Sequence, residues 1–370
     1  MESTRSTSLK DQESRALAAT LTGLLRTVIE RGGSDLHLTA GVNPIVRVNG
    51  KLIRLEDFPV MEDEDLRKMI YSILTSRQRE KLEESLELDL SYGLPGEARF
   101  RVNVFFQRDS IGAAFRLIPV VIRSLEELML PKQIAGFAEL ARGLVLVTGP
   151  TGQGKTTTLA ALVDLINVNR AEHVVTIEDP IEFLHSHKKA IINQREVGTD
   201  THSFTDALKH VLRQDPDVIL IGEMRDLETI AVALTAAETG HLVFATLHTL
   251  DAAQTVDRVI DVFPPNQQEQ VRIQLAGALQ GIVTQQLLPT RDSTARVPAV
   301  EVLIATPAVR NIIREGKTHQ IYSIIQAGGQ FGMQTMDQSL ANLYKAGKIA
   351  VDVALERCHD SVAFKQLIGT

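Results

Sequence analysis

One segment of the sequence has the residue types and the spacing to bind the phosphates of a nucleotide. Residues 149–156 read Gly-Pro-Thr-Gly-Gln-Gly-Lys-Thr and match the phosphate-loop pattern G-x-x-x-x-G-K-[ST] in full. The apolar run 144–148 precedes them and a helix-like stretch, 157–166, follows, which is the context that the pattern requires. Glycines let backbone N–H groups turn toward the phosphates, and the helix N-terminus adds the positive end of its dipole. The combination indicates an ATP site rather than a chance glycine-rich turn.

Two side chains of this segment have distinct expected roles. Lys155 would neutralise charge on the β- and γ-phosphates, and the hydroxyl of Thr156 would ligate Mg²⁺. ATP and Mg²⁺ are therefore the expected cofactors. The nucleotide contacts are expected from the whole loop and the residue after it: Gly149, Pro150, Thr151, Gly152, Gln153, Gly154, Lys155, Thr156 and Thr157.

A second apolar run, 218–221, lies in the segment Asp217 to Glu223 and leads to a carboxylate, as in a Walker B strand. Gly222 occupies the position at which many phosphate-loop ATPases carry a Mg²⁺-binding aspartate, which leaves Glu223 as the nearby acid. Glu223 is thus the candidate general base for the attacking water, and a candidate Mg²⁺ ligand through water. The alternative is a glutamate that caps a helix.

Two further strand ends carry groups that could act on the γ-phosphate, because ligands gather at the carboxyl edge of open α/β sheets. Glu178 and Glu182 lie in the acidic segment 176–182 and could order Mg²⁺ or polarise water, although a solvated acidic turn has the same pattern. His248 follows the apolar run 242–246 and could sense the γ-phosphate, whereas His241 at the other end of the run is expected to be structural. A lone histidine at a strand end is often structural, so the alternative stays open for His248.

Composition limits the classes of partner and compartment. The chain has 370 residues, a net charge of −7 and no long basic tract, which argues against nucleic acid as its main partner. The single cysteine, Cys358, fits a reducing cytoplasm. No apolar run reaches the roughly 18 residues of a membrane span, and the polar first residues lack the apolar core of a signal peptide. We expect a cytoplasmic chain that reaches a membrane only through a partner.

The hydrophobic pattern changes along the chain and predicts an α/β protein of two domains. A helical stretch at 21–29 and short alternating strands, with a hairpin turn at Asn49-Gly50, indicate a small α+β domain. Fully apolar runs from residue 140 onward are typical of parallel strands covered by helices on both faces. The predicted division is a polar disordered lead (1–16), the small domain (17–118), a linker (119–139), the ATPase core (140–305) and a helical C-terminal region (306–370).

The four chemical segments, in this order, resemble the Walker A, Asp, Walker B and His boxes of the secretion and type IV pilus ATPase superfamily. The resemblance extends from about residue 21 to beyond residue 340 and is carried further by residues 34–38, 192–198, 213–217, 222–229 and 236–241. Within the superfamily, residues 308–315, Ala-Val-Arg-Asn-Ile-Ile-Arg-Glu, are similar to the motif of retraction ATPases, with Val309 and Ile312 as mild changes. Assembly and secretion ATPases carry a longer N-terminal region and a tetracysteine insert, which one cysteine cannot form.

The resemblance implies a PAS-like N-terminal domain, a RecA-like ATPase domain and a hexameric ring that powers pilus retraction and twitching motility. Arginines of the N-terminal domain complete the nucleotide site in this family, and Arg101 and Arg116 match those positions; the alternative for each is a surface salt bridge. Gln153 and Thr156 depart from the serines usual in the family, and we expect activity to survive both changes. The implied partners are further copies of the chain, an inner-membrane platform protein and a second retraction ATPase.

Four other functions share parts of this pattern. An accessory retraction ATPase has the same motifs, and an assembly or secretion ATPase is disfavoured by the single cysteine. A ring subunit that binds nucleotide without hydrolysis is disfavoured by intact Lys155 and Glu223. A RecA-like DNA helicase is disfavoured by the acidic composition.

Overall fold

The computed structural model describes residues 20–48, 50–94, 96–118 and 121–369. The chain divides into two compact units, Met1–Val120 and Val121–Thr370, and each is described by itself. The predicted polar lead at 1–16 and Asn49 of the predicted hairpin turn lie outside the described residues.

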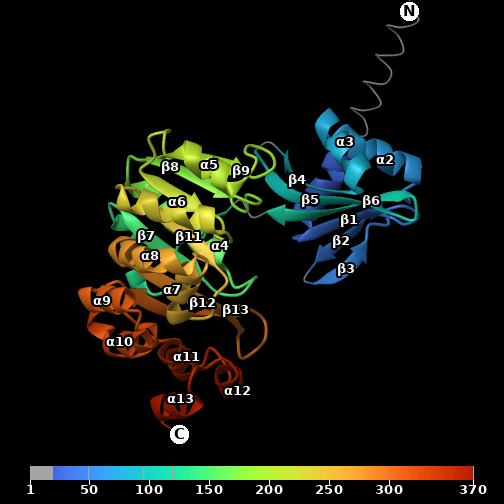
Figure 1. The fold of residues 1–370 in the computed structure, drawn as a ribbon. Coiled ribbons are helices and arrows are strands. Elements are labelled where there is room, and N and C mark those ends of the chain that lie inside the picture. The colour runs from blue at the N-terminus through green and yellow to red at the C-terminus, as the bar shows by residue number, and fades with distance from the viewer. Residues whose placement is uncertain (1–19, 49, 95, 119–120, 370) are drawn as a thin grey trace, which may run out of the picture. The chain divides into compact units, whose positions relative to one another are not determined.

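Unit 1 is a six-stranded antiparallel sheet with helices packed on one face (Figure 1). Alternation decides which face is buried: in β5, Phe100, Val102 and Val104 are fully buried, whereas Arg101 between them is exposed. The strand order is β3-β2-β1-β6-β5-β4. The elements are a helix at 20–30, β1 (Asp35–Thr39), β2 (Ile45–Val48), β3 (Lys51–Arg54), α2 (Asp63–Ser72), α3 (Ser76–Ser85), β4 (Glu87–Leu94), β5 (Ala98–Gln107) and β6 (Ser110–Ile118).

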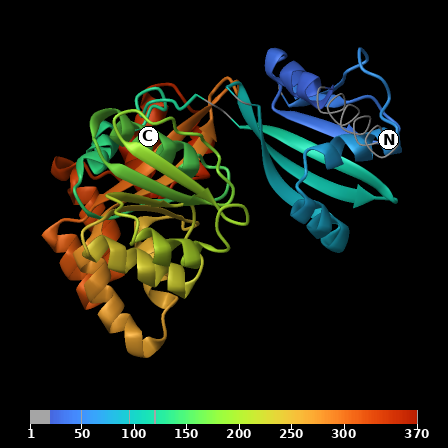
Figure 2. The same cartoon turned by 90° about the horizontal axis from the view of Figure 1, so that it is seen from above.

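Unit 2 is built on a seven-stranded sheet in the order β13-β12-β7-β11-β10-β8-β9 (Figures 1 and 2). All neighbouring pairs are parallel except β12 with β13. Four strands are buried along almost their whole length, as their apolar runs predicted: β7 (Gly143–Thr148), β8 (His173–Glu178), β10 (Val218–Ile221) and β11 (Leu242–Leu247).

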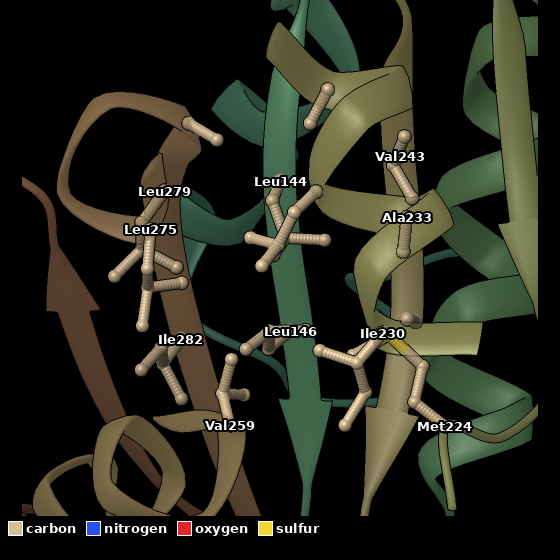
Figure 3. Packing of buried hydrophobic residues seen from close by; sticks show 14 of the residues in the cluster. Leu144, Leu146, Met224, Ile230, Ala233, Val243, Val259, Leu275, Leu279 and Ile282 are labelled. Carbon is tan, nitrogen blue, oxygen red and sulfur yellow. The ribbon is translucent and has the colours of Figure 1, made fainter. Parts of the chain in front are cut away.

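Helices cover both faces of this sheet. One face is packed by the 3₁₀ helix η1 (Lys132–Glu139) and α4 (Lys155–Asn169). The other face packs against α5 (Phe204–Val211), α6 (Leu227–Glu238), α7 (Ala252–Asp261) and α8 (Pro265–Ala278). Figure 3 shows part of the packing on this second face, where Leu144 and Leu146 of β7 lie beside Ile230 of α6 and Val243 of β11. The central strands β7, β8, β10 and β11 are apolar on both faces because both faces are covered.

Three strands of unit 2 were not predicted: β9 (Ile191–Glu196), β12 (Leu279–Pro289) and β13 (Arg296–Ile304). β9 and β12 carry polar side chains that interrupt the apolar run, among them Gln194, Gln285 and Gln286. Sheet pairing with β8 and β7 stabilises them despite this composition.

The chain beyond β13 is helical, as predicted, and begins at α9 (Pro307–Glu315). Its last part forms a separate apolar cluster with the β12–β13 hairpin, in which Leu288 and Val297 meet Leu340 and Phe364. The other helices are α10 (Ile321–Ala327), α11 (Met336–Lys345), α12 (Val351–Leu355) and α13 (Ser361–Ile368), with short 3₁₀ turns at Thr318–Gln320 and Gly329–Phe331.

Candidate functional site: a phosphate loop and two strand ends

The phosphate loop leaves β7 at Thr148 and enters α4 at Lys155. Gly149, Gly152 and Gly154 adopt positive φ angles of 136°, 78° and 82°, a region that favours glycine. Space is a second reason at Gly149, where an added Cβ would lie 2.3 Å from the backbone oxygen of Gln285. Glycine is therefore required there by conformation and by the close approach of β12.

Lys155 begins α4 and its side chain turns back into the loop. The residue is 8% exposed, and its Nζ donates to the carbonyl oxygens of Gly149 at 2.7 Å and Pro150 at 2.9 Å. Burial lowers the pKa of Lys155, while the carboxylates of Glu223 and Glu182 act in the opposite direction. The ammonium group is thus held by neutral carbonyls at the position where the pattern places phosphate charge.

Glu223 follows β10 by two residues and lies at the centre of a polar cluster. Its Oε1 is 2.9 Å from Nε2 of His248, at the end of β11, and 2.6 Å from Nε of Arg225. Nη2 of Arg225 also donates to Oε2 of Glu223 at 2.7 Å. Burial would raise the pKa of Glu223, but the bond from Arg225 and the nearness of His248 lower it below its usual value. Glu223 is therefore a carboxylate at neutral pH, as a general base must be.

His248 connects this carboxylate to the phosphate loop. Its Nδ1 lies 3.5 Å from both Lys155 Nζ and Thr151 Oγ1. If Nε2 carries the proton and donates to Glu223, Nδ1 is the free acceptor that faces Lys155. The structure thus brings together Lys155, His248 and Glu223, which are predicted from three separate segments.

The acidic segment is divided between two environments. Glu178 at the end of β8 is 7% exposed and accepts hydrogen bonds from Thr176 Oγ1 at 2.7 Å and Gln194 Nε2 at 3.1 Å. Burial raises the pKa of Glu178. Glu182 is exposed and lies close enough to act on the charge of Lys155. Glu182 is therefore near Lys155, whereas Glu178 is hydrogen-bonded within the β8–β9 pair.

The remaining predicted residues lie as follows. Thr156 and Thr157 are half-buried in the first turn of α4. His241 lies at the opposite end of β11 from His248, with Nδ1 3.0 Å from the carbonyl oxygen of Ala236. That contact agrees with the structural role expected for His241.

Arg101 and Arg116 belong to unit 1, where they are cross-strand neighbours on β5 and β6. Both are exposed, and Arg116 donates through Nε to Asp35 at 2.8 Å. Burial alone would raise the pKa of Asp35, but Ser34 and Arg116 lower it, so its charge persists beside Arg116.

Sequence reasoning missed two kinds of residue at this site. Arg225 binds both oxygens of Glu223, and its position two residues later in the motif was the available signal. Gln285 and Leu287 of β12 bind the phosphate loop from more than 130 positions away, and no local pattern indicates such contacts.

These features define a class: a phosphate-loop ATPase domain with a parallel sheet, preceded by a separate α+β domain. Residues 121–355 match the family model described as type II/IV secretion system protein, and the chain belongs to this family. It is 51% identical to the type IV pilus retractation ATPase PilT of Pseudomonas aeruginosa, over 91% of this chain and 97% of that protein. It is 50% identical to the twitching motility protein of Neisseria gonorrhoeae, over 93% and 92% of the two chains.

The chain is 44% identical to the type IV pilus ATPase PilU of Pseudomonas aeruginosa, over 90% of this chain and 87% of that protein. The crystal structure of the pilus retraction motor PilT with bound ADP matches with a TM-score of 0.87 at 51% identity, covering 93% of this chain and 98% of that one. The fold prediction is thus confirmed: an N-terminal domain precedes a RecA-like ATPase domain, and the chain is a nucleotide-binding ATPase.

Proposed function

We propose that this ATPase is a motor that powers the retraction of type IV pili, and thereby twitching motility. The observation that carries the proposal is 51% identity to a pilus retraction ATPase over 91% of the chain. The site supports it, because Lys155, His248 and Glu223 form one connected cluster next to the phosphate loop. Identity to an accessory pilus ATPase, PilU, is lower at 44%, and that role is the second candidate.

The phosphate loop would bind the nucleotide. Residues Gly149 to Thr157 would wrap the phosphates, with Lys155 moving its three donors from two loop carbonyls to phosphate oxygens. Mg²⁺ in such sites is held by one or two protein oxygens together with phosphates and water. The half-buried hydroxyl of Thr156 fits that role, with Glu223 as a ligand through water. When bound, Mg²⁺ supplies charge neutralisation at the β- and γ-phosphates.

Glu223 would accept the proton of the attacking water. Its lowered pKa keeps it ionised, and His248 donates to one oxygen and so orients the carboxylate. Arg225 occupies the second oxygen and has to release it before that oxygen can accept a proton. We assign Glu182 to the ordering of water or Mg²⁺ near Lys155, and Glu178 to the support of the strand ends.

Assembly and location follow from the same family. We infer that the chain acts as a homo-hexamer in the cytoplasm, peripheral to the inner membrane at the pilus base. Its partners would be an inner-membrane platform protein and a second retraction ATPase. Among the described residues, no helix combines the length and the apolar character that a bilayer span needs. We propose that Arg101 and Arg116 complete the nucleotide site and that His248 reports the γ-phosphate.

The test is genetic and chemical. The gene is introduced into a piliated strain that lacks both of its own retraction ATPases, and ATP turnover of the purified protein is measured in parallel. A retraction motor restores twitching by itself and hydrolyses ATP in the presence of Mg²⁺. Restoration only when the host's principal retraction ATPase is also returned would assign the accessory role. Turnover without any effect on pili in either strain would overturn the proposal.

A further inference from the structure

Gln153 is one of the two residues at which this phosphate loop departs from the serines usual in the family that it resembles. β12 pairs in parallel with β7 up to the pair Thr284 and Thr148, where β7 ends. β12 continues to Pro289, five residues beyond that pair. The extension of β12 (285–289) therefore has no strand partner on the β7 side, and the phosphate loop occupies that place.

Gln153 bridges the loop to this extension through both its side chain and its backbone. The backbone N–H of Leu287 donates to Oε1 of Gln153, and Nε2 of Gln285 donates to the carbonyl oxygen of Gln153 at 2.8 Å. Serine has one heavy atom beyond Cβ and is too short to replace the amide oxygen. The Gln153 side chain thus satisfies a backbone donor that a continuing strand would otherwise satisfy.

Other contacts hold the two segments in the same register. Gln285 is 3% exposed, and its Oε1 accepts from Thr158 of α4 at 2.7 Å. The backbone of Gln285 also passes so close to Gly149 that no Cβ fits there. Nη1 of Arg296, on the paired strand β13, lies 3.5 Å from the carbonyl oxygen of Gly152. The β12–β13 hairpin therefore contacts the start of the loop at Gly149, its tip at Gly152 and the following helix at Thr158.

We propose that Gln153 is a positioning residue that fixes the phosphate loop against the extension of β12 and thereby sets the affinity of the site for nucleotide phosphates. The loop must present its N–H groups inward, and a loop held in that shape before binding loses less conformational freedom when the phosphates arrive. The inference rests on the proposed assignment of residues 149–157 as the phosphate-binding segment. It adds a determinant of affinity from outside the motif, because the partners of Gln153 lie on β12.

The experiment compares ADP affinity, by calorimetry, and ATP turnover of the full chain in four variants. Gln153→Met keeps the length of the side chain and removes the acceptor, and Gln153→Ala removes both. Gln326→Met, on an exposed side of α10, is the matched control. Lys155→Ala tests the site itself. Hydrogen exchange at the Leu287 amide reports the bond directly, and thermal unfolding without nucleotide reports the fold.

We expect both Gln153 variants to bind ADP about three- to tenfold more weakly, which is the loss of one neutral hydrogen bond. KM for ATP should rise by a similar factor, whereas kcat at saturating ATP should change by less than about twofold. The Leu287 amide should exchange faster, and the unfolding temperature should be unchanged. Wild-type ADP affinity in Gln153→Met, with binding lost in Lys155→Ala, would overturn the role of Gln153 alone. Wild-type affinity in Lys155→Ala would overturn the site. A lowered unfolding temperature, together with a loss of kcat as large as the loss of ADP affinity, would assign Gln153 a purely structural role. That result would also overturn the inference.

Discussion

Two adjacent strands of the unit 2 sheet end in glutamates that lie in opposite environments. β8 ends at Glu178, which is 7% exposed and bonded to the neutral groups of Thr176 and Gln194. β10 pairs with β8 and leads to Glu223, which meets two nitrogen donors of Arg225 and one of His248. Burial raises the pKa of Glu178, whereas for Glu223 the bonds from Arg225 and the nearness of His248 outweigh burial and lower the pKa.

Position at the carboxyl edge of a sheet therefore does not by itself define a catalytic acid or base. A general base has to be ionised and has to reach water; Glu223 is half-buried with a lowered pKa, whereas Glu178 is buried with a raised pKa. Glu178 is shielded from water, burial raises its pKa, and its carboxyl already accepts from Thr176 and Gln194, which suits a residue that supports the ends of β8 and β9. Glu178 and Glu223 were both predicted as catalytic from the sequence. Their different environments indicate separate roles, which can be tested.

The largest effect is expected at Glu223. In Glu223→Gln, kcat for ATP hydrolysis should fall by a factor of about 10² to 10⁴, the range for loss of a general base. ATP binding should be retained, because the phosphate loop is unchanged. Steady-state turnover and ADP calorimetry check both statements. A kcat within tenfold of the wild type would remove Glu223 from the role of base.

A third glutamate extends the comparison to a carboxyl that is almost fully buried. Glu301 of β13 is 3% exposed, and burial, with Asp251 and Asp337 adding to it, raises its pKa to about 7. The backbone N–H groups of Ala252 and Met336 act in the opposite direction, and Tyr322 also faces this carboxyl.

Because the folded state holds the proton of Glu301 more tightly than the unfolded chain does, its contribution to stability is full below pH 4.5 and is lost as the pH rises through about 7. Glu301→Gln cannot ionise, so its free energy of unfolding should rise relative to wild type between pH 5 and 8, by on the order of 2 kcal/mol. Denaturant titrations at the two pH values measure this, with the exposed Glu269→Gln as control. A pH-independent difference would show that Glu301 does not titrate in this range.

A smaller effect is expected at Glu178. Glutamine keeps the oxygen that accepts from Thr176 and Gln194, so kcat of Glu178→Gln should fall less than about tenfold. Glu178→Ala leaves the Thr176 and Gln194 donors without their acceptor and should lower thermal stability more than the glutamine variant does. Equal loss of kcat and equal stability in the two variants would contradict a supporting role.

The smallest effect is expected at Arg225, whose side chain is 77% exposed. Its removal in Arg225→Ala should raise the pKa of Glu223, so the acidic limb of the kcat profile moves to higher pH, by an amount that solvent screening reduces. Arg258→Ala, an exposed arginine of α7, is the control. A profile that stays in place would show that the ion pair does not persist during turnover.

The sequence allowed much of this architecture to be predicted, since β7, β8, β10 and β11 carry apolar runs that are buried on both faces. Parallel strands end at a common edge, so the meeting of Lys155, Glu223 and His248 also followed from the motifs. β12 was not predicted because its glutamines interrupt the apolar run. Its contact with Gln153 could not be predicted either, because it joins residues 134 positions apart. The division between Glu178 and Glu182 depends on side-chain burial, which motif spacing does not specify.

The most direct test of the account measures steady-state ATP hydrolysis by Glu223→Gln and Glu178→Gln side by side, with ATP saturating and the assembly state of each variant checked by light scattering. Glu178→Gln should turn over at least about tenfold faster than Glu223→Gln, because only the latter lacks the base. Equal turnover by the two variants, or the reverse order, would contradict the assignment of different roles to these adjacent strand ends.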